Sequence, residues 1–217
     1  MIVSAYKPIP RCLLLEYDNR RDLALSFCRV QEFYESNKPE VYGKTLKFAD
    51  FTRSHMSSEG VITYFNESDG FNFSGDVFRK WLPYTLSAQE REMVAAIDLH
   101  LNTSEPFYVI GVIKGDTDTI RHELAHALYY LDEGYKTRVA KVISDIPPRE
   151  MANLWRVMRE LNYHDSVIVD EIQAWLSTSS RDELIGIGVV ICDEIKPVIS
   201  RFRSILKTFL NDYKVKL

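Results

Sequence analysis

Residues 120–131 read Ile-Arg-His-Glu-Leu-Ala-His-Ala-Leu-Tyr-Tyr-Leu, and this stretch decides how the rest of the chain is interpreted. Its apolar side chains recur at the spacing of one buried helix face, at Ile120, Leu124, Ala127, Leu128 and Leu131. Residues 115–119, Gly-Asp-Thr-Asp-Thr, are turn formers and helix-capping residues, and Gly134 follows the pattern. The sequence therefore predicts a helix that starts at this cluster and ends near Gly134.

The predicted helix brings His122 and His126 together, with Glu123 beside them. Two residues in this spacing lie one turn apart along a helix and about 40° apart around its axis, so both imidazoles can bind one ion. A helix with the pattern HExxH is the metal helix of zinc hydrolases, in which the Glu acts as general base. We therefore expect Zn²⁺ as cofactor, His122 and His126 as metal ligands, and Glu123 as the catalytic residue.

A catalytic zinc takes three protein ligands and keeps one position for water, so a third ligand is needed. Asp132 follows the motif at the spacing used by some zinc peptidases, but Tyr129 stands where their turn-forming glycine would be. Without that glycine the helix continues, and Asp132 would then lie about 15 Å along the axis from His122. This distance excludes Asp132 as a ligand of the same ion.

Glu171 is the stronger candidate for the third ligand. Apolar residues at helical spacing in 167–176 predict a second helix, which would offer this carboxylate to the first. Pro147 and Pro148 interrupt the intervening chain, which is long enough to turn back and pack against the motif helix. Asp170 and His164 remain alternative third ligands.

The pattern His122-Glu123-x-x-His126 followed by residues 171–174, Glu-Ile-Gln-Ala, resembles the gluzincins. These are zinc metallopeptidases with HExxH and a downstream ExxA or ExxxD helix. The resemblance spans roughly residues 105–178 and implies zinc peptidase chemistry in a zincin-like fold, with a protein or peptide as substrate. Residues 122–128 are also similar to smaller intracellular zincins that regulate phage or stress repressors, which would imply a regulatory protease.

The resemblance also raises two questions about supporting residues. Many gluzincins have an Asp, which orients a zinc-bound histidine, where this chain has Trp175, so Asp165 or Asp193 is expected to take that role. Gluzincins often stabilise the oxyanion with a Tyr or His beyond the third ligand, but only Tyr213 follows Glu171 here. The remaining candidate oxyanion donors are Tyr163, His164, Tyr130 and Tyr135.

In the expected mechanism, zinc lowers the pKa of its bound water to about 7 and so provides a nucleophile at neutral pH. Glu123 accepts the proton from this water and then passes it to the leaving amine. Two alternatives remain: a noncatalytic or regulatory binding protein with a zincin fold, and a zinc amidase that acts on a nonprotein amide, since the same water activation serves other bonds.

The rest of the chain predicts an α+β fold that is zincin-like, with a small mixed sheet in the N-terminal half and a mostly helical C-terminal half. Strands are expected at 12–17 and 106–113, and strands with a hairpin within 41–73. Helices are expected at 21–35, 74–82, 88–101, 136–146, 149–161 and 198–213. We expect one domain over 1–217, with an N-terminal α/β subdomain at 1–104 and a helical subdomain with the motif helix at 105–217.

Composition limits the classes of function. The 217 residues are 46% hydrophobic and 27% charged, enough for one substantial core. A net charge of −4 gives no basic surface for nucleic acid, and no pattern specifies an oligomeric state. The three cysteines, Cys12, Cys28 and Cys192, are expected to be reduced thiols. We find no signal peptide and no run of about 18 apolar residues, so the sequence predicts a cytoplasmic protein without a membrane span, although signal-independent export leaves no pattern.

Overall fold

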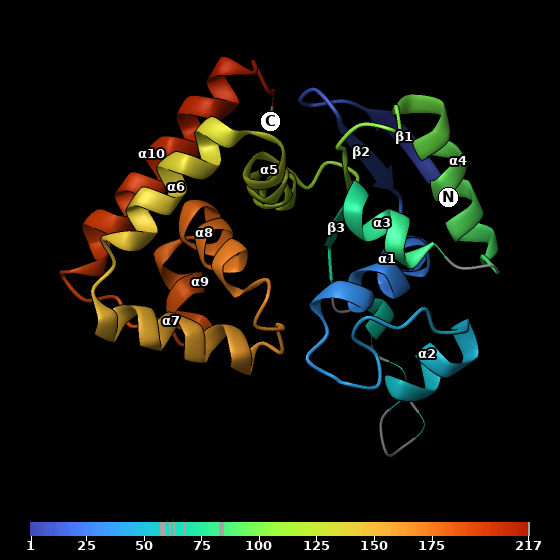
Figure 1. The fold of residues 1–217 in the computed structure, drawn as a ribbon, viewed down its shortest axis with the longest axis horizontal. Helices are drawn as coiled ribbons and strands as arrows, with labels where there is room; N and C mark the ends of the chain where they lie inside the picture. The colour runs from blue at the N-terminus through green and yellow to red at the C-terminus, as the bar shows by residue number, and fades with distance from the viewer. Residues whose placement is uncertain (57–59, 61, 63, 67, 83–84, 217) are drawn as a thin grey trace. The chain divides into compact units, whose positions relative to one another are not determined.

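The computed structural model describes residues 1–56, 60, 62, 64–66, 68–82 and 85–216 (Figure 1). The fold is α+β, with a small sheet in the N-terminal half, as predicted. The chain divides into two compact units, Met1–Ile120 and Arg121–Leu217. The sequence places the division at 104, before the strand that leads into the motif helix; the structure places it at the start of that helix, because this strand belongs to the sheet.

The sheet is mixed and contains β1 (Ile2–Tyr6), β2 (Cys12–Tyr17), β3 (Gly70–Ser74) and β4 (Tyr108–Ile113). Their order is β1-β2-β4-β3, in which β4 pairs parallel to β2 and antiparallel to β3. The apolar runs of β2 and β4 are explained by this topology, because strands in the middle of a sheet are buried on both faces. The predicted strands at 12–17 and 106–113 are confirmed.

Gly111 lets the first helix lie directly on the sheet. A Cβ at this position would lie 2.6 Å from the Phe27 Cζ atom and 2.8 Å from the Leu23 Cδ1 atom. Both neighbours belong to α1 (Arg20–Glu35), which packs across β2, β3 and β4. The glycine is therefore required for close helix–strand packing.

Three further helices belong to the first unit, namely α2 (Phe48–Ser54), α3 (Gly75–Trp81) and α4 (Ala88–His100), together with the short 3₁₀ helix η1 (Tyr64–Asn66). The predicted capping box before α4 is present, since the Ser87 hydroxyl accepts from the Glu90 N–H and the Glu90 carboxylate accepts from the Ser87 N–H. This local signal defines the start of the helix correctly.

The prediction of strands and a hairpin within 41–73 is confirmed only for β3, because the rest of the described part of this segment contains the helices α2 and η1. Part of the expected hairpin, including Glu67, lies outside the described residues. The aromatic residues of this segment form a packed cluster: the Phe51 ring lies 5.4 Å from Tyr64 and 4.4 Å from His55, and Phe48 stacks on Phe65. Tertiary packing overrides local strand propensity here.

The described part of the second unit is helical. It contains α5 (Thr117–Leu131), which begins in the first unit, α6 (Glu133–Ser144), α7 (Pro148–Glu160), α8 (Ile168–Thr178), α9 (Arg181–Gly186) and α10 (Ile195–Asp212). Helix α10 packs on α6 and α8, and α7 packs on α8. Helix α5 ends earlier than predicted, because the Asp132 side chain accepts a hydrogen bond from the Tyr135 N–H and caps α6. None of the described helices is long and apolar enough to span a membrane.

The three cysteines are free thiols, and they differ in burial. Burial raises the pKa of the Cys12 thiol and also raises the pKa of Cys28, to which the charge of Glu90 adds. Cys192 is only half-buried. Because the thiolate is the reactive form, a colorimetric thiol reagent is expected to modify Cys192 alone in the native protein and all three thiols after unfolding. The variant Cys192→Ser should then show no fast reaction; fast modification of all three native thiols would contradict this burial.

Candidate metal centre

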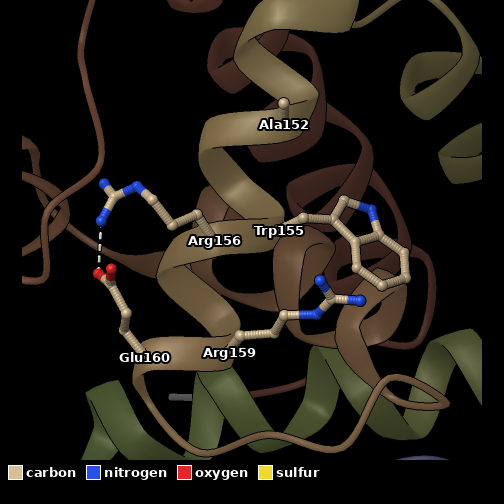
Figure 2. A pocket seen from close by; sticks show the side chains of 5 residues that line it. All are labelled: Ala152, Trp155, Arg156, Arg159 and Glu160. Carbon is tan, nitrogen blue, oxygen red and sulfur yellow. Dashed lines mark hydrogen bonds and ion pairs between the residues drawn. The ribbon is translucent and has the colours of Figure 1, made fainter.

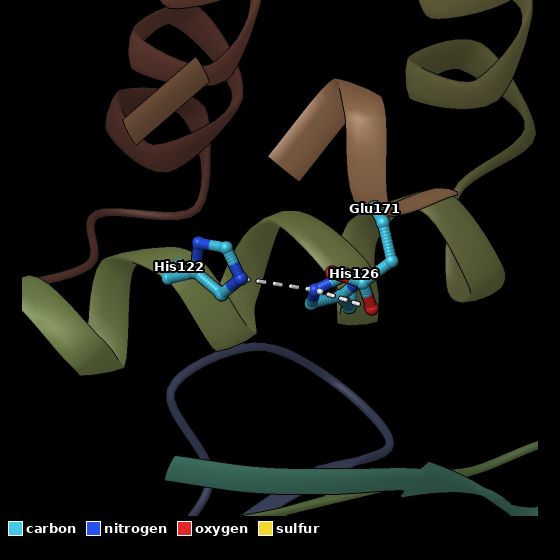
Figure 3. Close-up of side chains that lie close together, drawn as sticks. All are labelled: His122, His126 and Glu171. Carbon is cyan, nitrogen blue, oxygen red and sulfur yellow. Dashed lines mark hydrogen bonds and ion pairs between the residues drawn. The ribbon is translucent and has the colours of Figure 1, made fainter. Parts of the chain in front are cut away.

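The three predicted metal ligands meet in the second unit (Figure 3). His122 and His126 come from α5 and Glu171 comes from α8, and one ligand atom from each lies within 4.8 Å of the others. The Nε2 atoms of the two histidines are 3.3 Å apart, and the His126 Nε2 atom is 3.7 Å from the Glu171 Oε1 atom. A carboxylate and two imidazoles thus converge from two helices.

The spacing of these atoms fits a zinc ion. Two imidazole nitrogens bound to one tetrahedral zinc at about 2.0–2.1 Å lie about 3.3 Å from each other. The observed separation of the His122 and His126 Nε2 atoms is 3.3 Å. The buried Glu171 Oε2 atom has no hydrogen-bond partner among the described residues, which is costly for a carboxylate unless a cation is nearby. The donor set of two nitrogens and one oxygen is that of a catalytic zinc site.

Thr178 sets the orientation of the His122 ring. Its hydroxyl oxygen lies 3.0 Å from the His122 Nδ1 atom and donates its only hydrogen to the Ala174 carbonyl at 2.8 Å. The Nδ1 atom must therefore carry the proton in this contact, which leaves the Nε2 lone pair directed at the site. The Trp175 ring packs edge to face on His122, with centroids 5.5 Å apart.

Asp170 has the same role for His126. Its Oδ1 atom is 3.0 Å from the His126 Nδ1 atom, so the carboxylate accepts from the Nδ1–H group and the Nε2 atom faces the site. Asp170 is therefore placed to orient a candidate ligand, since it contacts the His126 nitrogen opposite to the one that faces Glu171.

The expectation that Asp165 or Asp193 orients a ligand is wrong. Asp165 pairs with Arg159 at 2.8 and 2.9 Å, and Asp193 pairs with Lys196 at 2.7 Å. The sequence pattern placed no such partner next to Glu171. The structure uses the residue directly before Glu171, because the first turn of α8 presents both carboxylates to α5.

The charges at the site favour a cation. Burial lowers the pKa of His122 to about 3, and the positive charge of His126 adds to this effect. Burial also lowers the pKa of His126, but the charges of Asp170, Glu171 and Glu123 outweigh it and raise this pKa well above its ordinary value. Burial raises the pKa of Glu171, the positive charge of His126 opposes this, and the charges of Asp170 and Glu123 raise the pKa further. A divalent cation between the two imidazoles would offset two of the three negative charges of these carboxylates.

Glu123, the predicted catalytic residue, is buried, with 5% of its surface exposed. Its charge acts on both His126 and Glu171, so it lies beside the proposed ligands without belonging to the set of three that can share one ion.

The candidate oxyanion donors lie in different environments. A hydrogen bond from Tyr163 lowers the pKa of Glu171 against the larger opposing effect of burial, so its hydroxyl is near the site. His164 uses its Nδ1 atom in the turn before α8, where it accepts from the Ser166 N–H at 3.2 Å. Tyr130 is half-buried in the last turn of α5. Tyr135 is unsuitable, because it is fully buried and its hydroxyl donates to Gln173.

Sequence reasoning missed two contacts of α8, namely that of Thr178 with His122 and that of Gln173 with Tyr135. A signal for Thr178 was present, since Glu171, Ala174, Trp175 and Thr178 follow the i, i+3, i+4, i+7 spacing of one helix face. That face of α8 carries the candidate third ligand Glu171, the Trp175 ring that packs on His122, and the Thr178 hydroxyl that orients the His122 ring.

A surface pocket on α7 is lined by an aromatic ring and charged side chains, with no histidine among the described residues that line it (Figure 2). The Arg159 guanidinium lies over the Trp155 ring at 5.4 Å, and Arg156 pairs with Glu160 at 2.5 Å. The residues that line the pocket are Ala152, Trp155, Arg156, Arg159 and Glu160, and none of them belongs to the histidine cluster.

Comparisons with protein-family models, with curated proteins and with solved structures found no match for this chain.

Proposed function

We propose that this protein is a zinc metallopeptidase with a zincin-like fold. The observation that carries the proposal is the convergence of His122, His126 and Glu171 at a spacing that fits zinc, with the buried carboxylate of Glu123 beside them. Thr178 and Asp170 support it, because both hold an imidazole with its Nε2 atom directed at the site.

Zinc, when bound, would act as a Lewis acid and lower the pKa of water to about 7. Glu123 would accept a proton from the attacking water and then donate it to the leaving amine. Tyr163, whose hydroxyl reaches the Glu171 carboxylate, is the best placed of the candidate donors to the oxyanion of the scissile carbonyl.

The test begins with the metal content of the purified protein and its action on a peptide library, read by mass spectrometry. The proposal predicts near-stoichiometric zinc and cleavage that a chelator removes and zinc restores. Stoichiometric zinc with cleavage of nonprotein amides alone would favour the amidase, and zinc without hydrolysis would favour the binding protein.

Removal of the metal is also expected to lower the stability of the second unit. A ligand that binds only the folded state stabilises it by RT ln(1 + [L]/Kd), which is about 2.7 kcal/mol at a hundredfold excess over Kd. Because α5 and α8 both supply ligands, zinc would hold the two helices together. Thermal unfolding of the protein with and without zinc measures the effect. The same zinc addition should not shift the unfolding of His126→Ala; an equal shift in that variant would contradict the assignment.

A further inference from the structure

A buried chain of hydrogen bonds leads away from the proposed metal centre. The Tyr135 hydroxyl donates to the Gln173 Oε1 atom at 2.9 Å, and the Gln173 Nε2 atom donates to the Asp170 Oδ1 atom at 2.9 Å. The same Asp170 oxygen lies 3.0 Å from the His126 Nδ1 atom. The chain thus connects α6 through α8 to the histidine on α5.

The direction of each hydrogen bond in this chain is determined by its chemistry. A carboxylate only accepts, so the Gln173 amide must turn its NH₂ group towards Asp170. The Gln173 Oε1 atom then faces Tyr135, whose hydroxyl must donate. Asp170 therefore receives hydrogen bonds from Gln173 and from His126 on one oxygen, which defines the position of its carboxylate relative to the imidazole.

Burial makes this arrangement difficult to replace. Gln173 and Tyr135 are both fully buried, which is unusual for a glutamine. The Asp170 side chain, in contrast, is 29% exposed, and its hydrogen bonds to Gln173 and His126 oppose rotation of the carboxylate towards water. Without Gln173, the group that orients His126 would gain rotational freedom.

We infer that Gln173 and Tyr135 are positioning residues that hold Asp170, and through it His126, in the orientation that binds the metal. The inference rests on the proposed zinc site. It differs from a purely structural role, because it predicts an effect on metal affinity that depends on Asp170.

The experiment titrates zinc into apo-protein in competition with a chromophoric chelator, with folding checked by circular dichroism. Loss of a group that orients a metal-bound histidine typically weakens metal binding 10- to 100-fold, so Gln173→Met is expected to weaken zinc binding by roughly that factor. Tyr135→Phe removes one neutral hydrogen bond and is expected to weaken zinc binding about 2- to 10-fold. Should Gln173→Met fail to fold, Tyr135→Phe decides the question.

Val139→Ala is the matched control. Val139 is fully buried one turn after Tyr135 on α6 and has an apolar side chain, so its truncation loosens the same helix without breaking the chain of hydrogen bonds. The zinc affinity of Val139→Ala should stay within about twofold of the wild type, since the apolar Val139 side chain takes no part in the hydrogen bonds that lead to His126.

A double-mutant cycle tests the dependence on Asp170. Asp170→Ala should weaken zinc binding by itself, and adding Gln173→Met should then have no further effect. The inference is overturned if wild-type protein binds zinc and Gln173→Met or Tyr135→Phe binds it equally well, or if Gln173→Met is as damaging without Asp170 as with it. Absence of zinc from the wild type, or of hydrolysis by its zinc form, would instead count against the proposed function.

Discussion

Glu123→Gln is expected to abolish peptide hydrolysis while zinc remains bound. Glutamine keeps the size and hydrogen-bonding shape of the side chain but cannot accept the proton of the attacking water. A positioned general base or acid typically contributes 10²- to 10⁴-fold to the rate, so kcat should fall by about that factor. Zinc content should stay near the wild-type value, because Glu123 is outside the set of three proposed ligands.

The matched control for this variant is Glu133→Gln, which makes the same chemical change at an exposed position in the first turn of α6. Its kcat should equal that of the wild type. Steady-state kinetics on a cleaved peptide, with zinc measured in the same samples, gives both quantities. Turnover by Glu123→Gln within a few fold of the wild type would remove Glu123 from the mechanism.

Glu90→Gln is expected to cause a large loss of stability in the first unit. Arg29 and Glu90 form an ion pair that is almost fully buried, with the Arg29 Nε and Nη2 atoms 2.6 and 2.5 Å from the carboxylate. Arg29 also donates to the carbonyls of Leu46 and Thr85, and Glu90 closes the capping box of α4. Every polar atom of the pair is thus used in holding α1, α4 and two loops together.

Removal of the Glu90 charge leaves the guanidinium buried without a counter-charge, which typically costs roughly 3–5 kcal/mol. This is a large part of the total stability of a domain, which is about 5–15 kcal/mol. Urea unfolding measures the change. Glu160→Gln, which breaks the exposed Arg156–Glu160 pair on α7, is the control and should change stability too little to measure. A loss in Glu90→Gln as small as in this control would mean that the buried pair does not hold the unit together.

Much of the candidate site was predictable because its signals are local. The spacing of His122 and His126 allows both imidazoles to reach one ion on any regular helix. The spacing of the apolar residues around Glu171 placed Glu171 on a second helix. The strand before the motif helix and the capping box of α4 were predicted for the same reason. Each of these features depends on a few residues that are close in sequence.

The remaining features depend on how helices pack. Thr178 orients His122 only because one face of α8 lies against α5, and Tyr135 reaches Gln173 only because α6 packs nearby. The segment after α1 was predicted as strands because apolar residues alternate there with turn residues, but its aromatic rings pack on one another instead of forming a sheet face. Such contacts between distant residues cannot be predicted from the spacing of residues in the sequence.

X-ray absorption spectroscopy at the zinc edge identifies the atoms that bind the metal. We expect one zinc per chain, bound by two imidazole nitrogens and a carboxylate oxygen at about 2.0–2.2 Å, with the oxygen contribution reduced in Glu171→Ala. Glu150, Cys192 and Glu194 form a second group of potential ligands within 4.8 Å of one another. A sulfur ligand at about 2.3 Å would indicate that zinc binds there, and that result, or a protein that binds no zinc, would contradict the assignment of His122, His126 and Glu171 as the metal centre.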